Sequence, residues 1–243
     1  CQRGKNEKGI FVSTTYIQLL EKTKAIASAL MELGVKRGDR IGLLSDNRPE
    51  WLALDISILS LGAIDVPRGR DAMEYEIEYI LKTTEAEVCV VENLELYKKL
   101  TNVSDRLPKL KYVIVIDEAG IELNSSVISY KALLSRGIER LGMEGEREKI
   151  EREVMLGDES DTATIIFTSG TTGLPKGVMS THGNFLYICG VGNSLYPFKK
   201  GEKWLSVLPV WHSFERIIQY LFISLSHTIV YSKPIGKIML TDI

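Results

Sequence analysis

The chain has 243 residues, of which 44% are hydrophobic and 26% charged, a composition that supports a folded core and excludes a disordered polymer. Thirty Lys and Arg nearly balance 32 Asp and Glu, so no overall positive field favours nucleic acid. The three cysteines and three histidines lack metal-type spacing, and no apolar run is long enough to cross a bilayer. Isolated cysteines of this kind favour a reducing compartment such as the cytoplasm.

Helix and strand patterns alternate through the first part of the chain. Thr14 or Thr15 can cap a helix that ends at Gly34, and Asn47 is expected to cap a second helix with Pro49 in its first turn. Strands are expected at 40–44, 63–66, 88–91 and 112–116, with further helices at 72–81 and 94–100. The dense charged run at 144–153 predicts a solvated helix face or a linker.

The same alternation continues to the end of the chain. Strands are expected at 163–167, 204–208 and 228–231, with a helix at 183–195 and an apolar helix at 214–225. Apolar strands separated by helices predict an α/β fold with parallel-rich sheets and helices on both faces. We expect residues 1–243 to form one incomplete domain, with an internal boundary allowed near 142–161.

The most informative segment is T-S-G-T-T-G-L-P-K-G at 168–177, directly after a predicted strand. Its glycines let backbone N–H groups approach an anion, and its hydroxyls and lysine add further donors and a positive charge. This pattern predicts a loop that holds nucleotide phosphates. It is not a Walker A loop, because counting from Gly170 places Pro175 where the second glycine is required.

The loop, continued as V-M-S-T-H-G-N to Asn184, resembles the phosphate-binding motif of the adenylate-forming enzymes. The segment L-P-V-W-H-S-F-E-R at 208–216 resembles the part of these enzymes that lines the acyl pocket, and its Phe-Glu-Arg ending resembles long-chain fatty acyl-CoA synthetases. D-V-P-R-G at 65–69 and Y-S-K-P-I-G-K at 231–237 resemble the same subgroup. The resemblance extends over nearly the whole chain.

The resemblance implies an AMP-forming ligase that uses ATP, Mg²⁺, a long-chain fatty acid and coenzyme A. It assigns catalytic roles to Lys176 and His212, the acyl pocket to Trp211 and His212, and magnesium to Thr171 or Thr172. The ATP phosphates would be bound by Thr168, Ser169, Gly170, Thr171, Thr172, Gly173 and Lys176.

The later motifs of the resembled family are not found in these 243 residues. We therefore expect an N-terminal part of the large domain, without the C-terminal domain and inactive on its own. Alternatives are an acyl-ACP ligase, an acyl-AMP ligase, and a non-catalytic nucleotide-binding or scaffold protein. We expect a cytoplasmic location, peripheral membrane contact through the lipid substrate, and no nucleic-acid partner.

Overall fold

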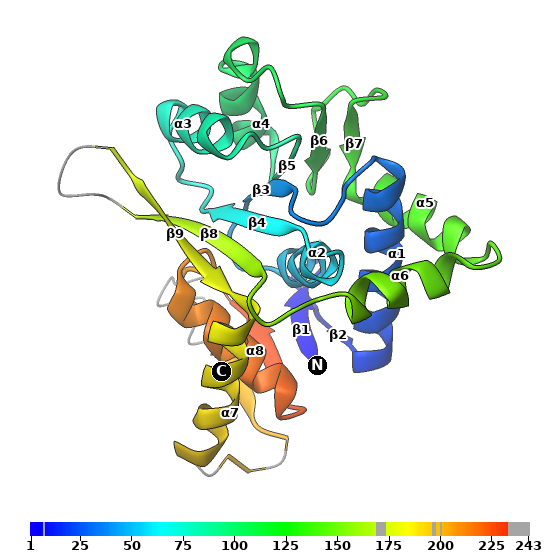
Figure 1. Ribbon diagram of the computed structural model, residues 1–243, viewed down its shortest axis with the longest axis vertical. Helices are drawn as coiled ribbons and strands as arrows, with labels where there is room; N and C mark the ends of the chain where they lie inside the picture. Colours follow the sequence, from blue (N-terminus) through cyan, green and yellow to red (C-terminus); the bar gives the residue numbers. More distant parts are fainter. Residues whose placement is uncertain (7, 169–173, 196–197, 200, 233–243) are drawn as a thin grey trace.

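The computed structural model describes residues 1–6, 8–168, 174–195, 198–199 and 201–232. Within these residues the larger β-sheet has seven strands: β3 (Arg40–Leu44), β4 (Ile64–Arg68), β5 (Val88–Val91), β6 (Tyr112–Val115), β7 (Val127–Ser129), β8 (Thr162–Thr168) and β9 (Lys176–Thr181). Their order is β7-β6-β5-β3-β4-β8-β9 (Figure 1). Neighbouring strands are parallel except β8 and β9, which form an antiparallel hairpin.

Helices cover both faces of this sheet, as the sequence predicts. One face carries α1 (Tyr16–Glu32), α2 (Pro49–Ser60), α5 (Tyr130–Leu141) and α6 (Glu146–Met155); the other carries α3 (Glu74–Thr84), α4 (Leu94–Thr101) and the short 3₁₀ helix η1 (Ser104–Arg106). Successive strand residues point to opposite faces, so Leu43 packs in the core beneath α1 and α2, whereas Leu44 packs with Ile77 of α3.

A smaller sheet joins the two ends of the described chain. It contains β1 (Gln2–Lys5), β2 (Phe11–Thr14), β10 (Lys203–Ser206) and β11 (Thr228–Tyr231), in the order β10-β11-β1-β2. Strand β1 pairs in parallel with β11, which places Gln2 opposite Ile229. Helices α7 (His182–Leu195) and α8 (Ser213–Ser224) pack against each other, and Phe222 of α8 lies in the same core cluster as Ile229 of β11.

Several sequence expectations are confirmed, and others need correction. Strands at 40–44 and 88–91 are confirmed, and Thr15 caps α1 through a capping box with Gln18. The expected cap by Asn47 is wrong: Arg48 is the N-cap residue of α2, and no side chain caps that helix. The run at 144–153 is mostly helical, but its Glu146 is buried and bonded to Ser28 and Arg140, because burial is tolerated when the carboxylate is fully paired.

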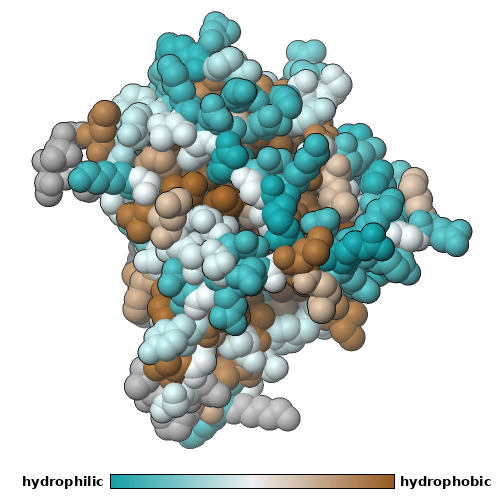
Figure 2. Space-filling model, in the orientation of Figure 1, coloured by the Kyte–Doolittle hydropathy of each residue, from teal (hydrophilic) through white to brown (hydrophobic). Residues whose placement is uncertain are grey.

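Several of the exposed apolar side chains lie on the β8–β9 hairpin and α7. Figure 2 shows hydrophobic residues near the β8–β9 hairpin and α7, where Met179 and Tyr187 are exposed, whereas hydrophilic residues dominate around α5 and α6. Such apolar surface is typical of faces that contact another segment or molecule. None of the helices in the described residues combines the length and apolar character needed to cross a membrane.

A buried arginine connects α8 with the larger sheet. The side chain of Arg216 is fully buried and donates hydrogen bonds to Asp55 of α2 and, at 2.8 Å, to Asp65 of β4. Its Nε also donates to the Tyr220 hydroxyl at 2.7 Å, and that hydroxyl donates to Asp55. The rings of Trp51 and Phe185 lie 5.5 and 5.3 Å from the guanidinium carbon.

One guanidinium in this cluster serves two carboxylates, so the cluster is short of one positive charge. Burial raises the pKa of Asp55 to about 7; the Arg216 charge opposes this effect and the nearby Asp65 carboxylate adds to it. In the unfolded chain the pKa of an Asp side chain is about 3.9. Between these values the folded state binds more protons than the unfolded state, so stability falls as the pH rises from about 4 to about 7.

We expect Arg216→Met to destabilise the fold in a pH-dependent way. Removing the shared cation leaves two buried carboxylates unpaired, which at pH 8 should cost about 3–5 kcal/mol of unfolding free energy. At pH 5 the loss should be smaller, because the carboxyls can take up protons instead. Urea unfolding at the two pH values measures the difference.

Arg147→Met is the matched control for this experiment. Arg147 also pairs with a carboxylate, that of Glu21, but both side chains are exposed. Its loss should be small and similar at pH 5 and pH 8, because an exposed carboxylate is stabilised by water when its partner is removed. An equal loss for Arg216→Met at both pH values would contradict the charge argument.

Candidate active site

The predicted phosphate loop begins and ends in strands. Strand β8 ends at Thr168, β9 begins at Lys176, and these two residues lie directly opposite each other in the antiparallel ladder. The expectation of one continuous loop over 168–177 is therefore corrected at both ends, because the hairpin pairing extends into it. Ser169, Gly170, Thr171, Thr172 and Gly173 lie outside the described residues.

The hairpin brings a hydroxyl and an ammonium group together at the stem of the loop. Opposed residues of an antiparallel pair project their side chains on the same face, so Thr168 and Lys176 flank the loop from one side. Both residues are exposed. An exposed lysine beside a hydroxyl can reach a bound anion, which is the arrangement that a phosphate site needs.

The position of β8 in the sheet places its carboxyl end, Thr168, at the edge where parallel α/β sheets bind ligands. Strand β8 runs parallel to β4, with Asp65 opposite Thr164, and the Thr164 hydroxyl donates to the Asp65 carbonyl at 3.1 Å. The carboxyl ends of β3, β4, β5 and β8 therefore open to the same edge. Ligands of such sheets bind beyond these carboxyl ends.

Trp211 lies against the chain just where β4 ends. The Arg68 guanidinium carbon is 4.7 Å from the centroid of the Trp211 ring. A Cβ atom added to Gly69 would lie 2.3 Å from the Trp211 indole nitrogen, so glycine is required for this contact. The Arg68 side chain is held in turn by Glu76 at 3.0 Å and by Asp71 at 3.1 Å.

His212 follows directly and is exposed at the same edge. Its ring centroid lies 4.2 Å from that of Trp211, with the two planes inclined by 36°. The half-buried indole thus forms a base on which the imidazole rests, with its nitrogens accessible to a ligand. The structure therefore brings Trp211 and His212 together with the ends of β4, on the sheet edge from which the phosphate loop also starts.

Two segments that the sequence singles out separately are in direct contact. Asp65 of 65–69 binds Arg216 of 208–216, and Arg68 and Gly69 pack on Trp211. Part of the third segment, 233–237, lies outside the described residues. The contacts show that the two segments form one structural unit, which their positions in the sequence do not reveal.

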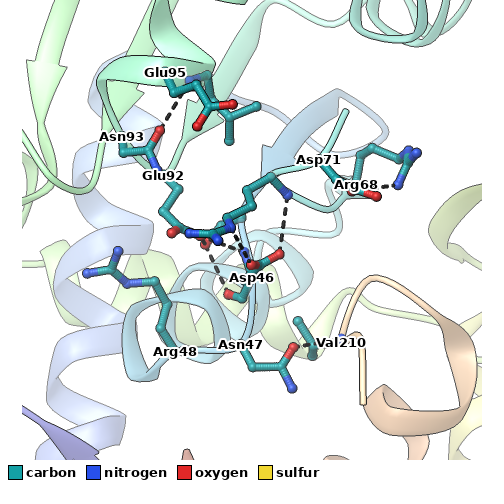
Figure 3. A network of polar contacts seen from close by, with 12 residues as sticks. Asp46, Asn47, Arg48, Arg68, Asp71, Glu92, Asn93, Glu95 and Val210 are labelled. Atoms are coloured by element: carbon teal, nitrogen blue, oxygen red, sulfur yellow. Dashed lines mark hydrogen bonds and ion pairs between the residues drawn. The ribbon is translucent and has the colours of Figure 1, made fainter. Parts of the chain in front are cut away.

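A polar network at this edge was missed in the sequence (Figure 3). Glu92, after β5, accepts hydrogen bonds from the Ser45 hydroxyl and the Asp46 amide, and Asp46 pairs with Arg70 at 3.1 Å. Asn47 bonds to the segment that precedes Trp211, including the amide of Val210 at 2.9 Å. The sequence does contain one indication of this network. Its charged and amide side chains all come shortly after the carboxyl ends of predicted parallel strands.

A metal site cannot be assembled from the described residues alone. Among them, no three His, Cys, Asp or Glu side chains lie close enough together to hold an ion. The predicted ligands Thr171 and Thr172 are in the part of the loop that is not described. Of the two described residues at its stem, Thr168 offers an exposed hydroxyl oxygen, whereas the Lys176 ammonium has no acceptor that could bind a cation.

Similar proteins are long-chain acyl-activating ligases. The chain is 33% identical over 212 residues to a chloroplastic long-chain-fatty-acid–[acyl-carrier-protein] ligase of Arabidopsis thaliana, covering 85% of this chain and 29% of that protein. It is 31% identical over 218 residues to a peroxisomal long chain acyl-CoA synthetase of the same plant, again covering 85% and 29%. The chain thus spans about a third or less of the length of these relatives.

Solved structures share the fold. A red-emitting luciferase of Phrixothrix hirtus superposes with a TM-score of 0.79 at 20% identity, over 98% of this chain and 44% of that one. A putative long-chain-fatty-acid CoA ligase of Rhodopseudomonas palustris gives 0.74 at 18% identity, over 95% and 52%. The model of the AMP-binding enzyme family matches residues 6–243. This match over nearly the whole chain shows that the chain belongs to the AMP-binding enzyme family.

Proposed function

We propose that this chain forms part of a ligase that activates a long-chain fatty acid with ATP and then transfers the acyl group to coenzyme A. The observation that carries the proposal is that the β8–β9 hairpin and the Trp211–His212 segment lie at the same edge of the larger sheet. The names of the relatives support the substrate class.

The first step joins the fatty acid to the nucleotide. A carboxylate oxygen attacks the α-phosphorus of ATP, the bond to the β-phosphate oxygen breaks, and pyrophosphate leaves an acyl-adenylate. Lys176 and the hydroxyls from Thr168 to Thr172 would bind the leaving pyrophosphate, while magnesium bound with ATP would neutralise part of its charge. His212 and Trp211 would hold the carboxylate where it meets the α-phosphate.

The second step releases AMP. The coenzyme A sulfur attacks the acyl carbonyl carbon, the carbon–oxygen bond to AMP breaks, and a thioester forms. All three cysteines are free, so we propose a reducing compartment such as the cytoplasm. The acyl chain would bring the protein into peripheral contact with a membrane.

A second candidate is an acyl-ACP ligase, because a relative at 33% identity carries that name. The chemistry of the first step is identical, and only the thiol differs. Supplying the full-length protein with coenzyme A or with phosphopantetheinylated carrier protein, at equal thiol concentration, decides between them. A product with carrier protein alone would replace coenzyme A in the proposal.

We expect Lys176→Ala to slow adenylate formation in the full-length enzyme. The lysine faces charge that grows as pyrophosphate leaves, and loss of one preorganised group of this kind typically costs about a hundred- to thousand-fold in rate. ATP–pyrophosphate exchange measures the step. Lys203→Ala, which removes an exposed lysine that likewise begins a strand, is the control and should leave the rate unchanged.

Substitution of the neutral donors should have smaller effects. Thr171→Ala and Thr172→Ala each remove a hydroxyl but no charge, so their exchange rates should lie between those of Lys176→Ala and the wild type. An unchanged rate for Lys176→Ala would remove the hairpin from the mechanism.

We expect the enzyme to prefer a long acyl chain, and Trp211→Ala to weaken that preference. Each buried methylene contributes roughly 0.8 kcal/mol, so a pocket that fits palmitate should favour it over a short acid by several powers of ten in kcat/KM. Trp211 would close the mouth of such a pocket. The measurement is kcat/KM across a series of acids from acetate to stearate.

Tyr75→Ala provides the control, because it removes an exposed aromatic ring on α3 that makes no contact with the Trp211 segment among the described interactions. Its chain-length profile should match the wild type. A wild-type maximum at acetate or at an aromatic acid would overturn the long-chain assignment and leave acid activation in place.

A further inference from the structure

The Asn47 side chain contacts residues 206–210, the segment just before Trp211, and does not cap its own helix. Its side-chain nitrogen donates to the Leu208 carbonyl at 2.6 Å and to the Ser206 hydroxyl at 2.8 Å. Its side-chain oxygen accepts from the Val210 amide at 2.9 Å, and Figure 3 shows this contact. The carboxamide therefore uses both ends, and Arg48 takes the N-cap position of α2.

The two main-chain bonds fix the backbone on both sides of Pro209. Proline has a fixed φ angle, and the Pro209 carbonyl accepts from the His212 amide at 3.0 Å. The stretch from Leu208 to His212 is consequently a short turn whose entry is held by Asn47. Trp211 and His212 are the next two residues after Val210, whose amide is bonded to Asn47. The position of their backbone therefore depends on the bonds that Asn47 makes.

Other side-chain hydrogen bonds to β10, the strand before this turn, come from α8, which packs on the same smaller sheet. Gln219 of α8 donates to the same Ser206 hydroxyl at 3.0 Å, and Glu215 accepts from the Trp204 indole at 3.0 Å. Burial raises the pKa of Glu215. Asn47 instead comes from the end of β3, in the larger sheet that also carries the phosphate hairpin.

We propose that Asn47 is a positioning residue that aligns Trp211 and His212 with the phosphate hairpin. It acts through the backbone of 208–210 and touches no reacting atom. The inference rests on the proposed function, because alignment matters only if the fatty acid and ATP meet at this edge. The buried Arg216 cluster ties α8 to the larger sheet independently, so loss of Asn47 should loosen the turn without unfolding the protein.

The first test measures the hold directly by hydrogen exchange in the 243-residue chain. The Val210 amide, which is bonded to Asn47, should exchange at least about tenfold faster in Asn47→Ala, a change of about 1.4 kcal/mol. Asn93→Ala is the matched control. Asn93 also follows a parallel strand, but its side chain caps α4 by accepting from the Leu96 amide at 3.1 Å. Its loss should destabilise α4 and leave Val210 exchange unchanged.

The second test measures the consequence in the full-length enzyme. Asn47→Ala should raise KM for palmitate about tenfold, the loss expected for about 1.4 kcal/mol of positioning, and leave KM for ATP within about twofold. Asn47→Asp keeps the size and the acceptor for Val210 but loses both donors, so its KM for palmitate should lie between. If Asn47→Ala fails to fold, Asn47→Asp replaces it in both measurements.

The outcomes separate this inference from the proposed function. Unchanged Val210 exchange, or an equal rise of KM for palmitate and ATP, overturns the positioning role. Faster Val210 exchange in Asn47→Ala, combined with no acid activation by the wild-type enzyme, overturns the proposed function. It also removes any catalytic role for the bonds that Asn47 makes. Faster exchange with a selective rise for palmitate supports both.

Discussion

The arrangement of the whole site depends on one buried arginine. Arg216 is enclosed by Asp55 and Asp65 from the larger sheet and its helices, while its own helix belongs to the smaller sheet. Bringing these charges out of water costs free energy that their attraction only partly returns, so the cluster is a weak source of net stability. Its value is geometric, because α8 must lie where the Arg216 guanidinium reaches both the Asp55 and the Asp65 carboxylates. Since α8 directly follows the turn with Trp211 and His212, the cluster also places that turn.

The contacts connect two segments that lie far apart in the sequence, 65–69 and 208–216. D-V-P-R-G supplies the buried carboxylate of Asp65 and, three residues later on the same strand, the cation of Arg68; Gly69 follows directly after the strand. Arg216 meets the carboxylate, and Trp211 packs on Arg68 where Gly69 leaves room for the indole. One strand thus locates both the helix and the aromatic side chain before it. A change in either string would disturb the other.

Local patterns in the sequence predicted much of the fold, and long-range contacts account for most of what they missed. The strand at 88–91 is apolar throughout, and the cap of α1 is formed by Thr15 and Gln18 within four residues. In both cases residues adjacent in the sequence determine the local structure. Strand β1 is polar and exists because β11, far along the chain, pairs with it. The sequence of β9 predicts a loop, because its extended conformation depends on pairing with β8. The local sequence predicts Asn47 as a helix cap, whereas its side-chain partners lie 159 to 163 residues away.

The two halves of the site are held with different degrees of independence. The β8–β9 hairpin is part of the larger sheet itself, whereas the turn at 208–212 extends from the smaller sheet. This turn is connected to the larger sheet through Asn47, Trp211 and the Arg216 cluster. Positioning of reacting groups to within about 1 Å can be worth two powers of ten in rate. For an attack of a carboxylate on a phosphorus atom, the relevant distance would span these two halves. In the proposed reaction, the connections made by Asn47 and by the Arg216 cluster would therefore contribute to catalysis although neither reaches a reacting atom, and substitutions there would alter the use of the acid before they alter the binding of the nucleotide.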